Sequence, residues 1–187
     1  MPEMTLKAEP FLGGHALDLG EVAVSEVTDI AIVSIATPLD GGDALASAVQ
    51  AAWGCALPAP RGTTSSSDGS VTLIFSTPDQ TLAIMPAVDG LAVTGVAATL
   101  GDAGYYTEQT DNWVGLRVLG PKAIAALERI CPLDLALIAI GGAERTVTEH
   151  LGVFIMREAD DQFLLLSGSS SAQSFLHAVE LSMRNVV

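Results

Sequence analysis

The sequence predicts an α+β fold made of two similar halves, each running strand, helix, strand, strand, helix. Short apolar runs bounded by turn residues are typical of strands, and they occur in both halves of the chain. Longer segments carry apolar residues at three- and four-residue spacing, which is typical of helices with one buried face. Because the order of these segments repeats once, two related α+β layers are favoured over a doubly wound parallel sheet.

The first half is predicted to contain three strands, two helices and a polar loop. Its first strand carries apolar groups on both faces, at Ile30, Ile32 and Val33, as a covered central strand does. A connection that contains Pro78 and Asp79 predicts a hairpin between the second and third strands. The predicted strands are residues 26–36, 71–76 and 81–85, the helices are residues 43–53 and 90–100, and the loop is residues 58–69.

The second half is predicted to follow the same order. One of its strands alternates between an aliphatic face and a face that carries Trp113 and Arg117. A Ser-rich stretch, residues 169–171, offers N-caps to a final helix whose apolar face runs from Ala172 to Met183. The predicted strands are residues 105–110, 113–119, 144–150, 153–157 and 162–167, and the preceding helix is residues 121–131.

The chain is long and apolar enough to form one domain, residues 1–187. With 187 residues, of which 49% are hydrophobic, it can bury a sizeable core. Residues 1–24 are rich in Gly and Pro and show no period, so they are predicted to form an N-terminal arm on the surface. The first half is then residues 25–103 and the second half is residues 104–187.

The charge balance excludes two classes of partner. Lys and Arg number 8 against 22 Asp and Glu, which gives a net charge of −14 without any basic cluster. Nucleic acids and anionic membrane surfaces need clustered basic residues, so neither is expected to bind. Charged residues make up only 16% of the chain, against about 25% in typical domains. Either the core is large, or apolar surface is covered by a partner or by self-association.

Motifs for catalysis, cofactor binding and metal binding are not recognised in the sequence, and none is predicted. The glycine patterns lack the spacing of nucleotide-binding loops, and the three histidines share neither a helix turn nor a strand face. Cys55 and Cys131 are far apart and have no partner nearby, so two free buried thiols in a cytoplasmic protein are expected. No apolar run approaches the length of a membrane span, and the N-terminus does not resemble a signal peptide.

Several single residues are candidates for contacts with a partner. Trp113 and Arg117 share a face opposite the aliphatic one, and an aromatic residue beside a rare cation is typical of an interface anchor. The alternative is that this face is covered by the chain's own helices. Cys131 completes an apolar stripe and is expected to be a buried structural residue. Asp134 is expected to cap a turn, with a ligand carboxylate as the alternative. Arg145 is expected to pair with a carboxylate, inside the chain or across an interface.

The stretch DNWVGLRVLGPKAIAALERICPLDL resembles the γ subunit of heterotetrameric sarcosine oxidase. Its most specific part is the block formed by Cys131, Pro132, Leu133, Asp134 and Leu135. The resemblance spans about residues 53–187. The other residues that carry it are Leu57, Pro58, Pro78, Asp79, Gln80, Trp113, Leu116, Arg117, Gly120, Pro121, Leu127, Arg145, Thr146, Arg157 and Phe163.

The resemblance implies a fold and a role. The fold would be similar to the folate-binding domain of aminomethyltransferases. The role would be that of an accessory subunit without an active site, in a cytoplasmic complex that demethylates sarcosine to glycine. FAD, FMN, NAD and tetrahydrofolate would be bound by the larger, flavin-binding subunits. Two alternatives are a free-standing folate-binding helper or aminomethyltransferase-like enzyme, and an α+β dimerisation module.

Overall fold

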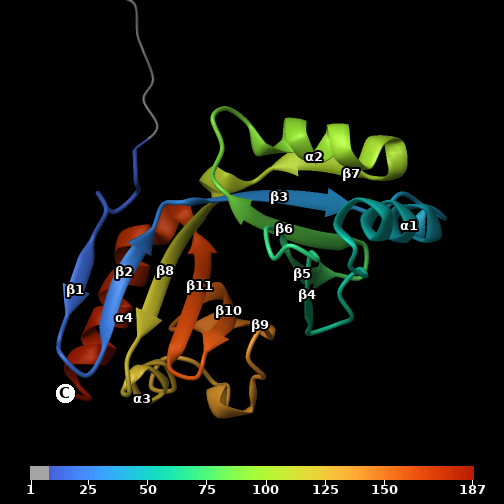
Figure 1. The fold of residues 1–187 in the computed structure, drawn as a ribbon. Helices are drawn as coiled ribbons and strands as arrows, with labels where there is room; N and C mark the ends of the chain where they lie inside the picture. Colours follow the sequence, from blue (N-terminus) through green and yellow to red (C-terminus); the bar gives the residue numbers. More distant parts are fainter. Residues whose placement is uncertain (1–8) are drawn as a thin grey trace, which may run out of the picture.

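The computed structural model describes residues 9–187 and arranges them in four layers, with two β-sheets between two layers of helices (Figure 1). Sheet A has the strand order β1-β2-β8-β11-β10-β9, and sheet B has the order β4-β5-β6-β3-β7. All neighbouring strands are antiparallel. The strands are β1 Ala16–Asp18, β2 Ala23–Val27, β3 Ile30–Ala36, β4 Thr63–Ser65, β5 Thr72–Thr77, β6 Gln80–Pro86, β7 Tyr105–Glu108, β8 Trp113–Leu119, β9 Ala143–Thr148, β10 Leu151–Ala159 and β11 Gln162–Gly168. The helices are α1 Gly42–Trp53, α2 Ala92–Leu100, α3 Ala123–Leu127 and α4 Ala172–Arg184.

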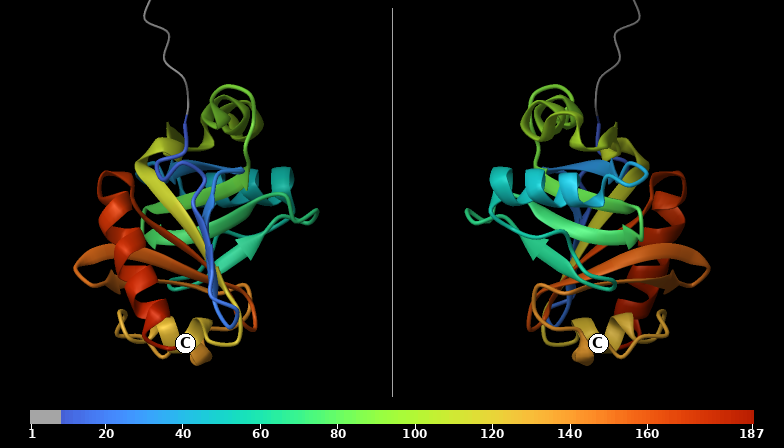
Figure 2. Two further views of the ribbon diagram at one scale, coloured as in Figure 1. Left: turned by 90° about the vertical axis from the view of Figure 1, so that its left-hand side faces the viewer. Right: turned by 90° about the vertical axis from the view of Figure 1, so that its right-hand side faces the viewer.

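Three apolar clusters hold the layers together. One lies between sheet A and the helices α3 and α4, and a second lies between sheet B and the helices α1 and α2. The third lies between the sheets, where Phe154 and Leu164 of sheet A pack with Ile32 and Leu82 of sheet B. Figure 2 shows α4 on the outer side of sheet A and α1 on the outer side of sheet B. Both sheets are therefore covered on both faces.

The two halves are built alike, down to the register of their strands. The order β3-α1-β4-β5-β6-α2 matches the order β8-α3-β9-β10-β11-α4. The three strands predicted after the helix of the second half are present, whereas the first half has three strands after its first helix rather than the two predicted. The hairpins β5–β6 and β10–β11 both contain an irregularity just before Gln80 and Gln162, which start equivalent strands. The α+β class and the internal similarity predicted from the sequence are confirmed.

Each half completes its sheet with a strand from the other half. β7 precedes β8 in the chain but pairs with β3, and β2 precedes β3 but pairs with β8. Glu26 lies opposite Leu116 and Glu108 lies opposite Val33, at the fourth residues of the equivalent strands β8 and β3. The division at residue 104 stays a prediction, and strand pairing crosses it in both directions.

The exchange corrects two expectations from the sequence. The predicted strand 26–36 is two strands in different sheets, separated at Thr28 and Asp29, because β2 turns towards β8 and β3 towards β6. The predicted arm, residues 1–24, contains β1 and the start of β2 in sheet A, and its residues 1–8 lie outside the described residues. Pairing with β8 stabilises β2, and β2 in turn pairs with β1, a three-residue strand that carries little β signal of its own.

Smaller corrections come from turns that local patterns did not reveal. The predicted helix 121–131 is regular only in the five residues of α3, and the predicted loop 58–69 contains the short strand β4. The predicted strand 105–110 ends at Glu108 because a 3-10 turn begins at Thr110. Ser171 precedes α4 without a side-chain capping bond, since residues 169–171 form a 3-10 turn. The apolar face predicted for α4 is buried as expected.

Candidate interaction surface

The chain from the end of α3 into the start of β9 holds most of the candidate residues, and we call residues 131–145, of which the last three lie in β9, the 131–145 loop. Cys131, Leu135 and Ile138 are buried and anchor it to the core under sheet A. Leu137 and Ile140 point outward, with 81% and 59% of their surfaces exposed. Pro132, Asp134 and Arg145 are also exposed, and Leu133 is half-buried. The loop therefore presents large apolar side chains from a buried base.

Two carboxylates fix the turn in the middle of this loop. Asp134 begins the 3-10 turn Leu135–Leu137, and its side chain accepts a hydrogen bond from the backbone N–H of Ala136 at 3.2 Å. Glu128 accepts another from the N–H of Leu135 at 3.2 Å. These bonds satisfy amide groups that the short turn leaves without partners. The capping role predicted for Asp134 is confirmed.

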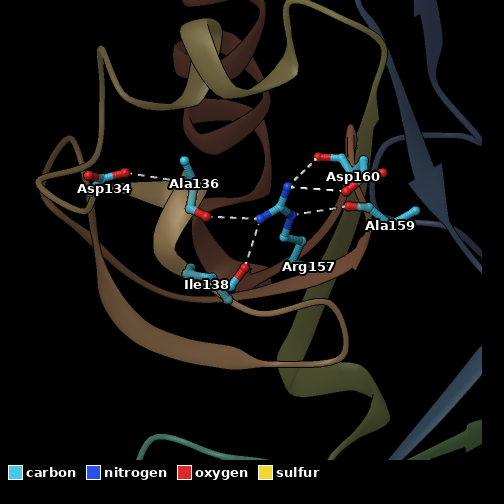
Figure 3. A network of polar contacts seen from close by, with 6 residues as sticks. All are labelled: Asp134, Ala136, Ile138, Arg157, Ala159 and Asp160. Carbon is cyan, nitrogen blue, oxygen red and sulfur yellow. Dashed lines mark hydrogen bonds and ion pairs between the residues drawn. The ribbon is translucent and has the colours of Figure 1, made fainter.

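Arg157 of β10 fastens the loop to the β10–β11 hairpin, as Figure 3 shows. Its guanidinium donates to the carbonyl oxygens of Ala136 and Ile138 at 3.1 and 2.9 Å. It also donates to those of Ala159 and Asp160 at 3.3 and 3.0 Å. A planar fork with five N–H donors can serve several carbonyls at once, which an ammonium cannot do in the same geometry. The Arg157 side chain is only 13% exposed, and the acceptor residue Ile138 is buried, whereas Ala136, Ala159 and Asp160 are exposed.

Arg157 is not among the site residues predicted from the sequence. The signal that could have found it is a single cation after the apolar run VFIM in a strand, since an Arg at such a position needs acceptors nearby. The guanidinium also lies 5.9 Å from the centre of the Phe163 ring. Arg157 is thus the residue that makes the exposed side of the 131–145 loop rigid.

Cys131 is buried at the base of the loop, as predicted. Burial raises the pKa of its thiol, and hydrogen bonds with the Leu133 backbone and the Thr146 side chain oppose this rise only in part. Since the thiolate is the reactive form, a buried thiol with a raised pKa is a poor nucleophile. The structure therefore gives Cys131 a packing role.

We expect Cys131 to react with a thiol reagent only when the chain opens. In the native chain at pH 7, modification of Cys131 should be at least a hundredfold slower than in urea-unfolded chain, because access and thiolate fraction are both reduced. Quenched reaction followed by peptide mass spectrometry measures this for each cysteine separately. Equal rates in native and unfolded protein would contradict the packing role.

Trp113 and Arg117 make contacts inside the chain. The Trp113 ring packs edge-on against Phe154, with centroids 5.5 Å apart, at the margin of the cluster between the sheets. Arg117 donates to both carboxylate oxygens of Glu158, at 2.7 and 3.0 Å. Trp113 thus packs at the edge of the cluster between the two sheets, and Arg117 pairs with a carboxylate of its own sheet, so neither contact is with a helix. Their role in partner binding stays a prediction.

Burial and hydrogen bonding shift the pKa of the Glu158 carboxylate in opposite directions. Burial raises its pKa, but hydrogen bonds from Arg117 and from Gln162, the latter at 2.6 Å, outweigh burial and lower the pKa below its ordinary value. The pKa of Arg117 is raised by the hydrogen bond to Glu158. The pair is therefore ionised at neutral pH.

Glu144 and Gly141 connect the loop with the β4 region of sheet B, whereas Arg145 packs on a ring of sheet A. The Arg145 guanidinium lies 5.5 Å from the centre of the Phe154 ring, a cation–π arrangement. Glu144 pairs with Arg61 across the two halves, at 2.8 Å. The hydroxyl of Thr63 donates to the carbonyl of Gly141. A groove of about 580 Å³ runs between β4 and this part of the loop.

A second cavity lies where the exchanged strands cross, beside Trp113. Its volume of about 210 Å³ is below the roughly 300–1,000 Å³ typical of small-molecule sites. Glu26 lines it, but its two oxygens accept hydrogen bonds from the N–H groups of Leu12 and Gly14, at 2.9 and 2.7 Å. The equivalent Glu108 accepts from the Val93 N–H at 2.9 Å at the start of α2. Both carboxylates therefore bind backbone N–H groups of the chain itself.

Within residues 9–187, no group of three or more His, Cys, Asp or Glu side chains is placed to hold a metal ion. No helix of the same residues is long and apolar enough to cross a membrane.

Comparisons with known proteins identify close relatives. The sarcosine oxidase subunit γ of Arthrobacter sp. is 31% identical over 150 residues, which are 79% of this chain and 72% of that protein. The sarcosine oxidase subunit γ of Corynebacterium sp. (strain P-1) is 30% identical over 161 residues, which are 84% of this chain and 78% of that protein. No protein-family model matches the sequence.

Two solved structures share the architecture. A chain of the heterotetrameric sarcosine oxidase from Corynebacterium sp. U-96, in complex with pyrrole 2-carboxylate, superposes with a TM-score of 0.75 at 23% identity, covering 89% of this chain and 87% of that chain. The glycine cleavage system aminomethyltransferase T from Bartonella henselae superposes with a TM-score of 0.54 at 14% identity, covering 82% of this chain and 44% of that chain.

Proposed function

This chain belongs to the family of sarcosine oxidase γ subunits, and we propose that it assembles with larger subunits into a heterotetrameric sarcosine oxidase. Its α+β architecture is the folate-binding fold that aminomethyltransferase T also has. The proposed complex oxidatively demethylates sarcosine to glycine in the cytoplasm. FAD, FMN, NAD and tetrahydrofolate are proposed to bind the other, flavin-binding subunits.

Within that complex we assign this chain an accessory role. The polar groups that attract attention in the sequence are used by the fold itself: Arg117 pairs with Glu158, Asp134 caps a turn, and Cys131 is buried. The small cavity beside Trp113 and the engaged carboxylate of Glu26 also argue against a pterin-sized ligand in this chain.

The observation that carries the proposed contact is the exposed apolar side of the 131–145 loop. Leu137 and Ile140 are exposed on a loop whose backbone is fixed by Arg157, Asp134 and Glu128. Rigid presentation of large apolar side chains lowers the entropic cost of docking. Pro132, Leu133 and Asp134 precede these two residues in the chain and Arg145 follows them, and we propose that all six residues contact a larger subunit.

Replacing Leu137 with glutamate tests this surface. We expect Leu137→Glu to weaken binding to the larger subunits of the oxidase at least tenfold, because a carboxylate in an apolar interface must be desolvated without a partner. The Tm of the isolated chain should stay within about 1 °C, since an exposed side chain is changed. Co-expression, titration by surface plasmon resonance and thermal unfolding give these values.

Leu181→Glu on α4 is the matched control, because Leu181 is also an exposed leucine, at 53%. It should bind as the unchanged chain does. Equal affinities for Leu137→Glu and the unchanged chain would remove the loop from the interface. Failure of the unchanged chain to join the larger subunits would overturn the proposed function, and self-association alone would favour the dimerisation module.

A further inference from the structure

Arg145 is a cation for which the described chain supplies no counter-charge. It lies on β9, an edge strand of sheet A, opposite Phe154 of β10, and its guanidinium is 5.5 Å from the centre of the Phe154 ring. The ion pairs among residues 9–187 give Arg145 no carboxylate partner. A ring face attracts a positive charge but offers no oxygen to the five N–H donors of a guanidinium. Of the two expectations from the sequence, a carboxylate inside the chain or one across an interface, the described contacts favour the second.

A second arginine lines the same pocket as Arg145. Arg61, which precedes β4, and Arg145 both line a pocket of about 300 Å³, which we call the β9 pocket. Glu144 lines it as well; it accepts a hydrogen bond from Nε of Arg61 at 3.0 Å and lies 2.8 Å from Nη2. Two arginines against one carboxylate leave the β9 pocket with one excess positive charge. That sign is opposite to the net charge of −14 of the whole chain.

The remaining lining of the β9 pocket suits the stem of an acidic side chain. Phe75, Leu133 and Ala143 are apolar, and the first two are half-buried. Ser76 adds a hydroxyl. Apolar groups of this kind can pack against the methylene groups of an aspartate or glutamate, while the planar fork of Arg145 binds both carboxylate oxygens.

The β9 pocket continues the exposed apolar side of the 131–145 loop. It shares Arg61, Ala143 and Glu144 with the groove of about 580 Å³, which Leu137 and Ile140 also line. Figure 1 shows β4 and β5 next to β9, the strands from which the pocket is built. A protein segment docked on the 131–145 loop therefore extends to the pocket.

The exposure of the two arginines distinguishes a free anion from a side chain of a docked protein. Arg145 is exposed, and 76% of the Arg61 side chain is exposed. In water, exposed ion pairs contribute little, because solvent and salt screen them. A docked subunit excludes water from the pocket and strengthens the attraction between the same charges. The β9 pocket therefore favours a carboxylate that belongs to a protein surface over a free anion.

We propose that the β9 pocket binds an aspartate or glutamate side chain of a larger oxidase subunit, with Arg145 as the direct partner of its carboxylate. This inference rests on the proposed function, which supplies the subunit, and it adds the chemistry of the residue that the subunit brings. A chain with a net charge of −14 repels acidic groups over most of its surface. A locally positive pocket therefore also determines where an acidic residue of the partner can lie, which fixes the register of docking.

Glu144→Gln is a test in which the sign of the effect identifies the partner. The amide keeps an oxygen for Arg61 but removes the one negative charge of the pocket, so both arginines become available to an anion. We expect the affinity for the larger subunits, measured by surface plasmon resonance, to rise by about threefold or more. An unchanged or lower affinity, in a variant whose thermal unfolding shows that it is folded, would overturn the inference.

Arg145→Gln removes the direct partner of the carboxylate, and Arg129→Gln is its matched control. Arg129 is exposed, has no ion pair among residues 9–187 and does not line the β9 pocket. We expect Arg145→Gln to weaken binding to the larger subunits by about tenfold or more and Arg129→Gln to leave it unchanged. Arg145→Lys should recover part of the loss, because it keeps the charge but not the fork. The Tm of the isolated Arg145→Gln chain should fall by less than about 4 °C, since an exposed cation–π contact is lost.

The outcomes separate this inference from the proposed function. If the unchanged chain joins the larger subunits and Arg145→Gln joins them equally well, the β9 pocket binds no carboxylate of theirs, although the proposed function stands. Calorimetric binding of acetate to the isolated chain with a Kd below about 1 mM would make the occupant a free anion and overturn the inference. Dimers in analytical ultracentrifugation that Arg145→Gln converts to monomers would assign the carboxylate to a second copy of the chain, which overturns it as well.

Discussion

Arg157→Met is expected to lower the free energy of unfolding of the isolated chain by about 3 kcal/mol at pH 7, which corresponds to roughly 6–12 °C in Tm. Methionine keeps part of the aliphatic stem but leaves the carbonyls of Ala136, Ile138, Ala159 and Asp160 without their donor. Hydrogen bonds with a charged donor contribute more than the mean hydrogen bond, and the acceptor residue Ile138 is buried. Urea denaturation followed by circular dichroism measures the change.

A local measurement distinguishes loss of the loop from a general weakening of the core. Hydrogen exchange of the Leu137 and Ile138 amides, which donate to Asp134 and Leu135, should become faster in Arg157→Met than exchange in β10 and β11. Arg157→Lys should recover only part of the stability, because an ammonium lacks the planar fork. A free energy of unfolding within 0.5 kcal/mol of the unchanged chain would show that the bonds to Arg157 contribute little.

Arg117→Met is expected to lower the free energy of unfolding by about 2 kcal/mol at pH 7. It leaves the Glu158 carboxylate, with 18% of its side chain exposed, without its cationic partner. Glu158→Gln should lower the free energy of unfolding by less than Arg117→Met does, because an amide needs no counter-charge. The loss of unfolding free energy in the double variant should be smaller than the sum of the losses in the two single variants, because both substitutions remove the same ion pair.

The effect of Arg117→Met should depend on pH in a defined direction. The pKa of Glu158 in the folded chain lies below the ordinary value of 4.5, so the stability from the pair is fully present above that value. It is lost as pH falls through the lower pKa of the folded chain. The difference between the unchanged chain and Arg117→Met should therefore shrink below pH 4.5. An undestabilised Arg117→Met chain that fails to assemble would place Arg117 at the interface.

Local patterns predicted the elements whose stability is local. The helix at 43–53 and the final helix show their buried stripes in the sequence, because helical side chains three and four apart share a face. The hairpin around Pro78 and Asp79 was found because its turn residues restrict the backbone. The exchange of β2 and β7 left no such signal, since it depends on which distant edge accepts each strand.

The candidate residues divide in the same way. Cys131 and Asp134 were assigned correctly, because an apolar helical stripe and a turn cap are visible within a few residues. The sequence shows that the face carrying Trp113 and Arg117 differs from the aliphatic one, but it does not show that Trp113 packs beside the cluster between the sheets or that Arg117 pairs with Glu158. Leu137 and Ile140 lie in an apolar run that is typical of a buried segment. They are exposed because the chain turns there, at a backbone that Arg157 binds.

The strand exchange also determines when each sheet can be completed during synthesis of the chain. β2 is synthesised early, but Glu26 can pair with Leu116 only after β8 has been synthesised. Likewise, Val33 of β3 can pair with Glu108 only after β7 has been synthesised. Until then the nascent first half exposes an unpaired strand edge and an apolar sheet face, which are the features that promote aggregation. Contacts of such long sequence separation slow folding. Synthesis of the second half thus protects the first half from aggregation, and we expect the two halves to fold as one cooperative unit.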